Sequence, residues 1–175
     1  MVLDASVRLI VFPRGVSEAP WDREVWRDMQ RNAMFVGHTV DSMRLCDVLV
    51  GVEALRRDEG VDPSRIMVLG AAGSGVLGLY AAILDPQIAQ AMLINPPVTH
   101  ADAPIFLNAL RYTDLPEAAA LMAPRHLTFY GRMPAEYEYT RHVYALYGKS
   151  ANLARAMNVQ AVVEGRYDHN FASGS

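Results

Sequence analysis

The chain of 175 residues predicts an α/β domain, with a mostly parallel sheet of about five strands between two layers of helices. Two observations predict this. Apolar runs of strand length alternate with longer, helix-like segments, which is the order of a parallel sheet built from strand–helix–strand units. In addition, the glycine-rich stretch VLGAAGSGVLG, residues 68–78, follows one apolar run and opens a helix-like segment. Ligand-binding turns lie at such strand ends.

The first half of the chain is expected to hold two strands and a long helix. β-Branched and aliphatic residues at 6–12 predict a strand that ends in a Pro-Arg-Gly turn. The following segment, up to His38, is predicted to be a covering loop or a short helix. Apolar residues at three- and four-residue spacings over 39–57 predict an amphipathic helix. The almost continuously apolar run at 65–70 predicts a central strand.

The second half continues the alternation of helices and strands. A helix is expected to begin at Val76 and to be closed by Asp85–Pro86. The further expected elements are strands at 89–97, 125–131 and 158–165, with helices near 115–122 and over 138–157. Together these elements predict one domain over residues 1–171, followed by a flexible tail at 172–175.

Composition narrows the class of protein. The formal net charge is −3 and the basic residues are dispersed, so a nucleic-acid partner is not expected. No apolar run reaches the roughly 20 residues that span a bilayer, and the N-terminus does not resemble a secretory signal. We therefore expect a soluble domain without a membrane partner, in a compartment left open. The single cysteine, Cys46, is predicted to be a small core residue.

Three kinds of site use glycines between a strand and a helix. A phosphate-binding loop requires a lysine directly followed by Ser or Thr, and the first lysine of the chain is Lys149, so this kind is excluded. Residues Gly73, Gly75 and Gly78 fit the dinucleotide pattern G-x-G-x-x-G. That pattern also needs an acidic residue after the next strand, which here ends in Asn95 and two prolines. A nucleotide-binding oxidoreductase domain stays open as an alternative.

The third kind of site is the nucleophile elbow of a hydrolase. Laid on Gly70, the pattern small-x-nucleophile-x-small-small puts Ala72 at the nucleophile and Gly73, Ser74 and Gly75 at the small positions. The segments VFPRGVSE, GVDPSRIMVLG, LMAPRHLTFYG and EGRYDHNF fit the same frame. On these segments, from about residue 7 to 171, the chain resembles the α/β-hydrolase fold and, within it, acetyl xylan esterases and dienelactone hydrolases.

The resemblance implies carboxylic ester hydrolysis by a nucleophile, a general base, an orienting acid and an oxyanion site. The alanine at position 72 has no oxygen with which to attack. Ser74 therefore has two interpretations, a nucleophile two residues further along or an N-cap of the helix. The resemblance places the base at His169 and the oxyanion donor at the Gly73 N–H.

For the orienting acid, the resemblance leaves Asp102 and Glu136 as alternatives. His100 and Asp102 alone do not make a metal site, and no cofactor is expected. The ligand of an active enzyme would be a small-molecule or carbohydrate ester. A domain that binds a ligand or partner without catalysis is the competing class.

The resemblance also implies about three strands before the one at 6–12. We therefore expect the sheet to be completed by a missing N-terminal segment, by a different chain or by a second copy of this chain.

Overall fold

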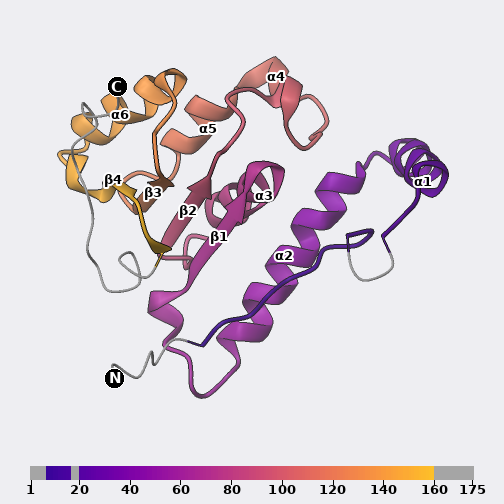
Figure 1. Ribbon diagram of the computed structural model, residues 1–175, viewed down its shortest axis with the longest axis horizontal. Helices are drawn as coiled ribbons and strands as arrows, with labels where there is room; N and C mark the ends of the chain where they lie inside the picture. The colour runs from indigo at the N-terminus through magenta and orange to yellow at the C-terminus, as the bar shows by residue number, and fades with distance from the viewer. Residues whose placement is uncertain (1–6, 17–19, 160–175) are drawn as a thin grey trace.

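The computed structural model describes residues 7–16 and 20–159 (Figure 1). Its helices and strands are, in chain order, α1 (Arg23–Phe35), α2 (Val40–Arg56), β1 (Met67–Ala71), α3 (Ala72–Leu84), β2 (Gln90–Ile94), α4 (Ala109–Tyr112), α5 (Leu115–Ala120), β3 (His126–Tyr130), α6 (Glu138–Leu146) and β4 (Leu153–Ala156). Short 3-10 turns lie between several of them. The α/β class predicted from the sequence is confirmed.

The four strands of the described residues form one parallel sheet in the order β1-β2-β3-β4. The register pairs Ala71 with Ile94, Ile94 with Tyr130, and Tyr130 with Ala156. The strands therefore end at one common edge of the sheet, where loops and helix starts gather.

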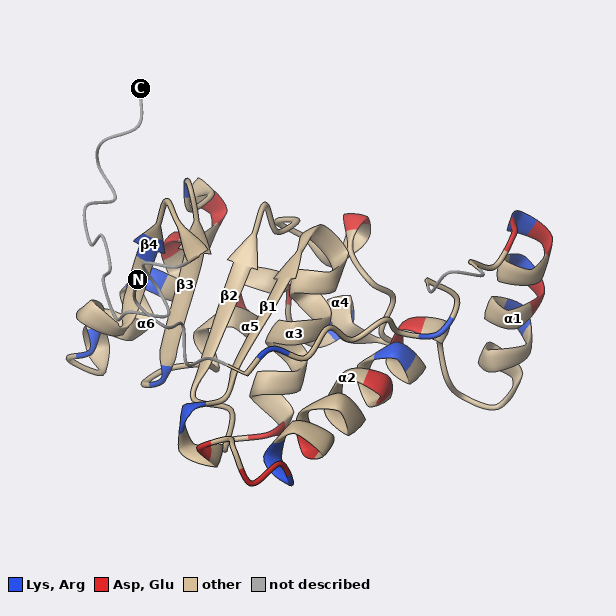
Figure 2. Ribbon diagram, turned by 60° about the horizontal axis from the view of Figure 1, so that its bottom comes forward, with Lys and Arg blue, Asp and Glu red and all other residues tan. Residues whose placement is uncertain are grey.

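The main core lies on one face of this sheet. Buried residues of β1 to β4, such as Val68, Leu93 and Phe129, form one cluster with side chains of α2, α3, α5 and α6. In Figure 2 the strands accordingly lie in front of α3 and α5. The cluster on the opposite face consists of the strand residues Met67, Met92, Tyr130 and Ala156. Among the described elements, the core cluster thus joins helices to a single face, and the second helical layer expected from the sequence is not among them.

The strand predicted at residues 6–12 is wrong for the part that the structure describes. Residues 7–12 form no strand. Instead, Val11 lies so close to Gly51 of α2 that a Cβ on Gly51 would come within 2.6 Å of the valine side chain. The residue types favour a strand, but a strand forms only where a neighbouring strand accepts its hydrogen bonds.

The helix predicted over 138–157 is also wrong in its second half. α6 ends at Leu146, and residues of the predicted helix form β4. Gly148 has φ +65°, and the N–H groups of Gly148 and Lys149 bond to the carbonyl groups of Ala145 and Tyr144. This is a Schellman C-cap, which stops a helix at a glycine. Of the strand predicted at 158–165, Asn158 is not in a strand and 160–165 lie outside the described residues.

Caps and ion pairs position the two helices beside the glycine-rich turn. α2 begins with a capping box, in which Thr39 accepts from the Ser42 N–H and Ser42 accepts from the Thr39 N–H. An ion pair of 2.5 Å between Arg56 and Asp85 joins the end of α2 to the end of α3. Cys46 is exposed and does not belong to the core as predicted, because α2 buries Leu45 instead.

The C-terminal end of α3 is also held by the side chain of Arg125. Arg125 Nη1 donates to the carbonyl groups of Ala82, Asp85 and Ile88, at 2.6, 3.2 and 2.8 Å. The last carbonyls of a helix have no N–H donor inside it, and a cation there also offsets the helix dipole. Arg125 therefore fixes α3 from the end opposite to the glycine-rich turn.

None of the described helices is long and apolar enough to cross a bilayer.

Candidate functional site

In the glycine-rich stretch, no loop residue separates strand β1 from helix α3. Ala71 is the last residue of β1 and Ala72 is the first of α3. The chain reverses here because Ala72 has φ +47°, a left-handed conformation that costs a non-glycine residue about 1–2 kcal/mol. The side chain of Ala72 is exposed. Position 72 is thus a strained, solvent-facing position between a strand and a helix.

Two glycines permit this sharp turn. A Cβ on Gly70 would lie 2.5 Å from the Ser74 carbonyl, and a Cβ on Gly75 would lie 2.8 Å from the Gly70 carbonyl oxygen. Both distances are shorter than carbon contacts in proteins allow. Gly78 differs, since its Cβ would meet Val68 at an ordinary 3.8 Å. Positions 70 and 75 therefore need glycine for the close passage of α3 over β1, whereas position 78 does not.

Positive φ angles also follow the next two strands. Asn95, directly after β2, has φ +45°, and Gly131, directly after β3, has φ +75°. Extended by one residue, the strand register sets Asn95 beside Ala72 and Gly131 beside Asn95. Backbone strain in proteins concentrates at functional sites, and this edge of the sheet carries two strained positions, Ala72 and Asn95, since a positive φ costs a glycine such as Gly131 nothing.

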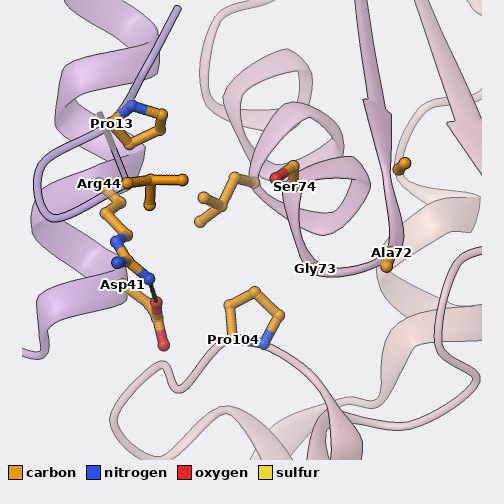
Figure 3. A pocket seen from close by; sticks show the side chains of 10 residues that line it. Pro13, Asp41, Arg44, Ala72, Gly73, Ser74 and Pro104 are labelled. Atoms are coloured by element: carbon orange, nitrogen blue, oxygen red, sulfur yellow. Dashed lines mark hydrogen bonds and ion pairs between the residues drawn. The ribbon is translucent and has the colours of Figure 1, made fainter. Parts of the chain in front are cut away.

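A pocket of about 280 Å³ opens at this turn (Figure 3). On one side lie α2 and the N-terminal segment, and on the other lies the start of α3. The lining residues are Pro13, Val16, Asp41, Arg44, Ala71, Ala72, Gly73, Ser74, Leu77 and Pro104. The lining mixes apolar side chains with the polar groups of Asp41, Arg44 and Ser74.

The polar wall of the pocket is built from α2. Asp41 is buried and accepts a hydrogen bond from the Ile105 N–H at 2.8 Å and one from Arg44 Nη1 at 3.3 Å. The Arg44 guanidinium lies 4.5 Å from the centre of the Trp26 ring. Its Nε donates to the Arg14 carbonyl at 3.0 Å. These contacts hold both side chains and pair the two charges, so the wall carries no net charge.

Ser74 is the third residue of α3 and lines the pocket. The N-cap of α3 is Ala71, and the helix begins without a side-chain cap. The interpretation of Ser74 as an N-cap is therefore wrong. The Gly73 backbone lies in the first helical turn, whose N–H groups have no acceptor within the helix, and Gly73 also lines the pocket. Gly73 faces Pro104: a Cβ on Gly73 would lie 3.5 Å from the proline ring.

Two other predicted site residues, Asp102 and Glu136, lie outside this pocket. Asp102 is exposed at the end of a 3-10 turn, His100–Asp102. Glu136 is exposed in another, Ala135–Tyr137. Neither residue lines the pocket. His169 lies outside the described residues.

Sequence reasoning missed the two charged residues of the pocket. Asp41 and Arg44 lie one helical turn apart on α2, and about thirty positions separate them from Ser74. The one local signal was an aspartate within the capping box of a predicted helix, which is normally a solvated position. Only the packing of α2 against α3 gives these residues a role.

A buried histidine lies outside the pocket. His100 Nε2 is 2.7 Å from the Tyr80 hydroxyl oxygen. The backbone N–H of His100 donates to the Asp114 carboxylate at 2.7 Å. Burial lowers the pKa of His100 and raises the pKa of Tyr80 to about 12. We interpret this group as structural, because it ties α3 to the loop after β2. Among the described residues, no group of three His, Cys, Asp or Glu side chains is arranged to hold a metal ion.

Several solved structures resemble this chain, among them the following two. Methylesterase BT1017 has a TM-score of 0.56 and 18% identity, over 67% of this chain and 30% of that one. A protein assigned as an acetyl xylan esterase (BF1801), from Bacteroides fragilis NCTC 9343, has a TM-score of 0.58 and 16% identity, over 82% of this chain and 44% of that one. No protein-family model matches the chain, and no curated protein is similar to it in sequence.

At these identities the likeness concerns the fold. The chain shares the fold of these two structures over the matched part, and it spans less than half of the length of either.

Proposed function

We propose that this chain is a hydrolase domain of the carboxylic ester type, related to acetyl xylan esterases, whose nucleophile position is residue 72 and is occupied by alanine. One observation carries the proposal: Ala72 has φ +47° at the junction of β1 and α3. A hydrolase elbow presents its nucleophile from such a strained strand-to-helix turn. Ser74 lies two residues into the helix and has no comparable presentation.

The pocket supports the same proposal. Ala72 and Gly73 line it together, so position 72 and a first-turn amide of α3 border the same cavity. In an ester hydrolase, the N–H after the nucleophile binds the oxyanion of the tetrahedral intermediate. Gly73 is the residue in that position. As the family resemblance implies, we assign the general base to His169 and the orienting acid to Asp102 or Glu136.

An alanine at the nucleophile position removes covalent catalysis but leaves the pocket. Methyl and hydroxymethyl groups differ by one oxygen, so the cavity keeps its shape while acyl transfer stops. The proposed function of the chain as it stands is therefore to bind a small-molecule or carbohydrate ester without hydrolysing it.

The glycine geometry argues against a dinucleotide site. In that fingerprint the second glycine lets the pyrophosphate approach and the third lets helix and strand pack closely. Here Gly75 is occupied by its contact with Gly70, and Gly78 has room for a Cβ. The residue after β2 is Asn95 and not an acid. None of these observations favours the nucleotide alternative.

Hydrolysis of a small activated aryl acetate tests the proposal. We expect no turnover above background by the wild type, and turnover by Ala72→Ser. The matched control is Ser74→Ala in both backgrounds, which should change neither result. Turnover by the wild type that Ser74→Ala abolishes would show that the nucleophile is residue 74. A folded Ala72→Ser variant without activity would count against position 72.

A further inference from the structure

The first strand of the sheet has an open edge. β1 pairs with β2 on one side and is the end strand of the described sheet. Its outer backbone N–H and C=O groups therefore face no strand among the described residues, and Leu69 in its centre is 44% exposed. Such an edge is a template for a further strand unless charge, proline or a bulge blocks it. β1 contains neither a charged residue nor a proline.

The same chain contains a strand-forming run that joins no described strand. Residues 7–12 read VRLIVF, and four of them are large and apolar yet exposed: Val7 51%, Leu9 48%, Ile10 75% and Phe12 66%. Leu9 and Ile10 are consecutive, and consecutive residues of a strand point to opposite faces. Apolar side chains of this run would therefore project to both faces of a strand. Continuous apolar runs of this kind are typical of strands that a sheet buries on both faces. In its own chain the run lies along α2, through the contact between Val11 and Gly51 (Figure 1).

We propose that two copies of this chain associate by reciprocal strand addition, in which residues 7–12 of one copy pair with the β1 edge of the other. Both halves of the interaction are present in every copy, so a two-fold axis satisfies both edges at once, as in domain-swapped dimers. Strand addition supplies main-chain hydrogen bonds, and the apolar side chains add buried surface.

The two surfaces fit each other in length and charge. The run has six residues and β1 has five. The run carries one charge, Arg8, and β1 carries none, so no like charges oppose one another across the pair. This inference goes beyond the proposed function and does not depend on it, because neither Leu69 nor residues 7–12 line the pocket.

Light scattering after size exclusion tests the association. We expect a dimer for the wild type and a monomer for Leu69→Lys, since an edge charge opposes strand pairing. Leu69 is exposed in the single chain, so lysine is compatible with its fold. Leu146→Lys is the matched control, because Leu146 is 86% exposed on α6 and should leave the dimer intact. A monomeric wild type, or a dimer that persists in Leu69→Lys, overturns the proposal, as does a dimer that Leu146→Lys dissociates.

Disulfide trapping distinguishes the proposed pairing of residues 7–12 with the partner's β1 edge from direct pairing of two β1 edges. In a Cys46→Ser background, chains with Leu69→Cys are mixed with chains that carry Leu9→Cys or Ile10→Cys. Both neighbours are used because a register shift of one residue turns a strand over. We expect a disulfide-linked heterodimer with at least one of the two. Linkage of Leu69→Cys chains to each other, or no linkage in either mixture, overturns the exchange.

Discussion

Gly70 and Gly75 lie in direct backbone contact, so that a Cβ on Gly75 would come within 2.8 Å of the Gly70 carbonyl oxygen. This contact lets α3 start at the last residue of β1. It also sets the strained backbone of Ala72 and the mouth of the pocket. Four predictions follow from this arrangement and from the contacts that hold α3.

Gly70→Ala should destabilise the fold by about 3 kcal/mol or more, because the new methyl group would overlap the Ser74 backbone and neither element can move without disturbing the core. Gly78→Ala, in α3, is the matched control because a Cβ there has room. It should be neutral or stabilising by up to about 1 kcal/mol, since alanine favours a helix over glycine. Urea unfolding of the two variants measures the difference. Equal effects of both substitutions would contradict the close packing at Gly70.

Ala72→Gly should stabilise the fold by about 1 kcal/mol, because glycine adopts a positive φ without the steric cost that a Cβ brings. Ala71→Gly, one residue earlier, should instead cost about 0.5–1 kcal/mol, since its φ of −107° suits alanine and glycine only adds entropy to the unfolded chain. Thermal and urea unfolding compare the pair. Destabilisation of similar size at both positions would show that residue 72 is not strained.

His100 should make the free energy of unfolding depend on pH. Burial lowers its pKa in the folded protein below the ordinary 6.5, so the unfolded chain binds the proton first. Its contribution is fully present above pH 6.5 and is lost as the pH falls from there towards the folded-state pKa, by at most about 1.4 kcal/mol per pH unit. Urea unfolding at about pH 8 and about pH 5 measures this dependence.

His100→Gln should remove this part of the pH dependence and lower stability at the higher pH, because the bond to Tyr80 is weakened. His142→Gln changes an exposed histidine of α6 and serves as the control that keeps the dependence. If the His100 variant and the wild type respond alike to pH, the burial of His100 has no such consequence.

Arg125→Met should cost about 2–3 kcal/mol, because three carbonyl groups at the end of α3 lose a charged donor. Methionine keeps most of the side-chain length, so the loss reports hydrogen bonding more than packing. Arg132→Met, at an exposed arginine after β3, should change stability by less than about 0.5 kcal/mol. Chemical unfolding provides the comparison, and similar losses for the two variants would rule out the capping role of Arg125.

Local patterns predicted the central elements well. The runs that became β1, β2 and β3 are apolar and bounded by glycine or proline, and α2 carries its own capping residues. The errors have physical causes. Residues 7–12 have the composition of a strand but pack on α2, because pairing depends on a partner and not on composition. Gly148 was a visible stop signal for α6, and it was missed because apolar spacing continued beyond it.

The candidate site was predictable only in part. The register from Gly70 identified position 72 as the special residue of the turn, and its positive φ fits that assignment. The pocket wall of Asp41 and Arg44 was not predictable, because it depends on how α2 crosses α3. Nothing in the spacing of the chain links these residues to the turn.

The central claim is that residue 72, and not Ser74, stands in the nucleophile position. Treatment of the wild type and of Ala72→Ser with a fluorophosphonate probe, followed by mass spectrometry of the adduct, tests it most directly. We predict that the folded wild type takes no label and that Ala72→Ser is labelled at residue 72. Labelling of the wild type at Ser74 would contradict the claim.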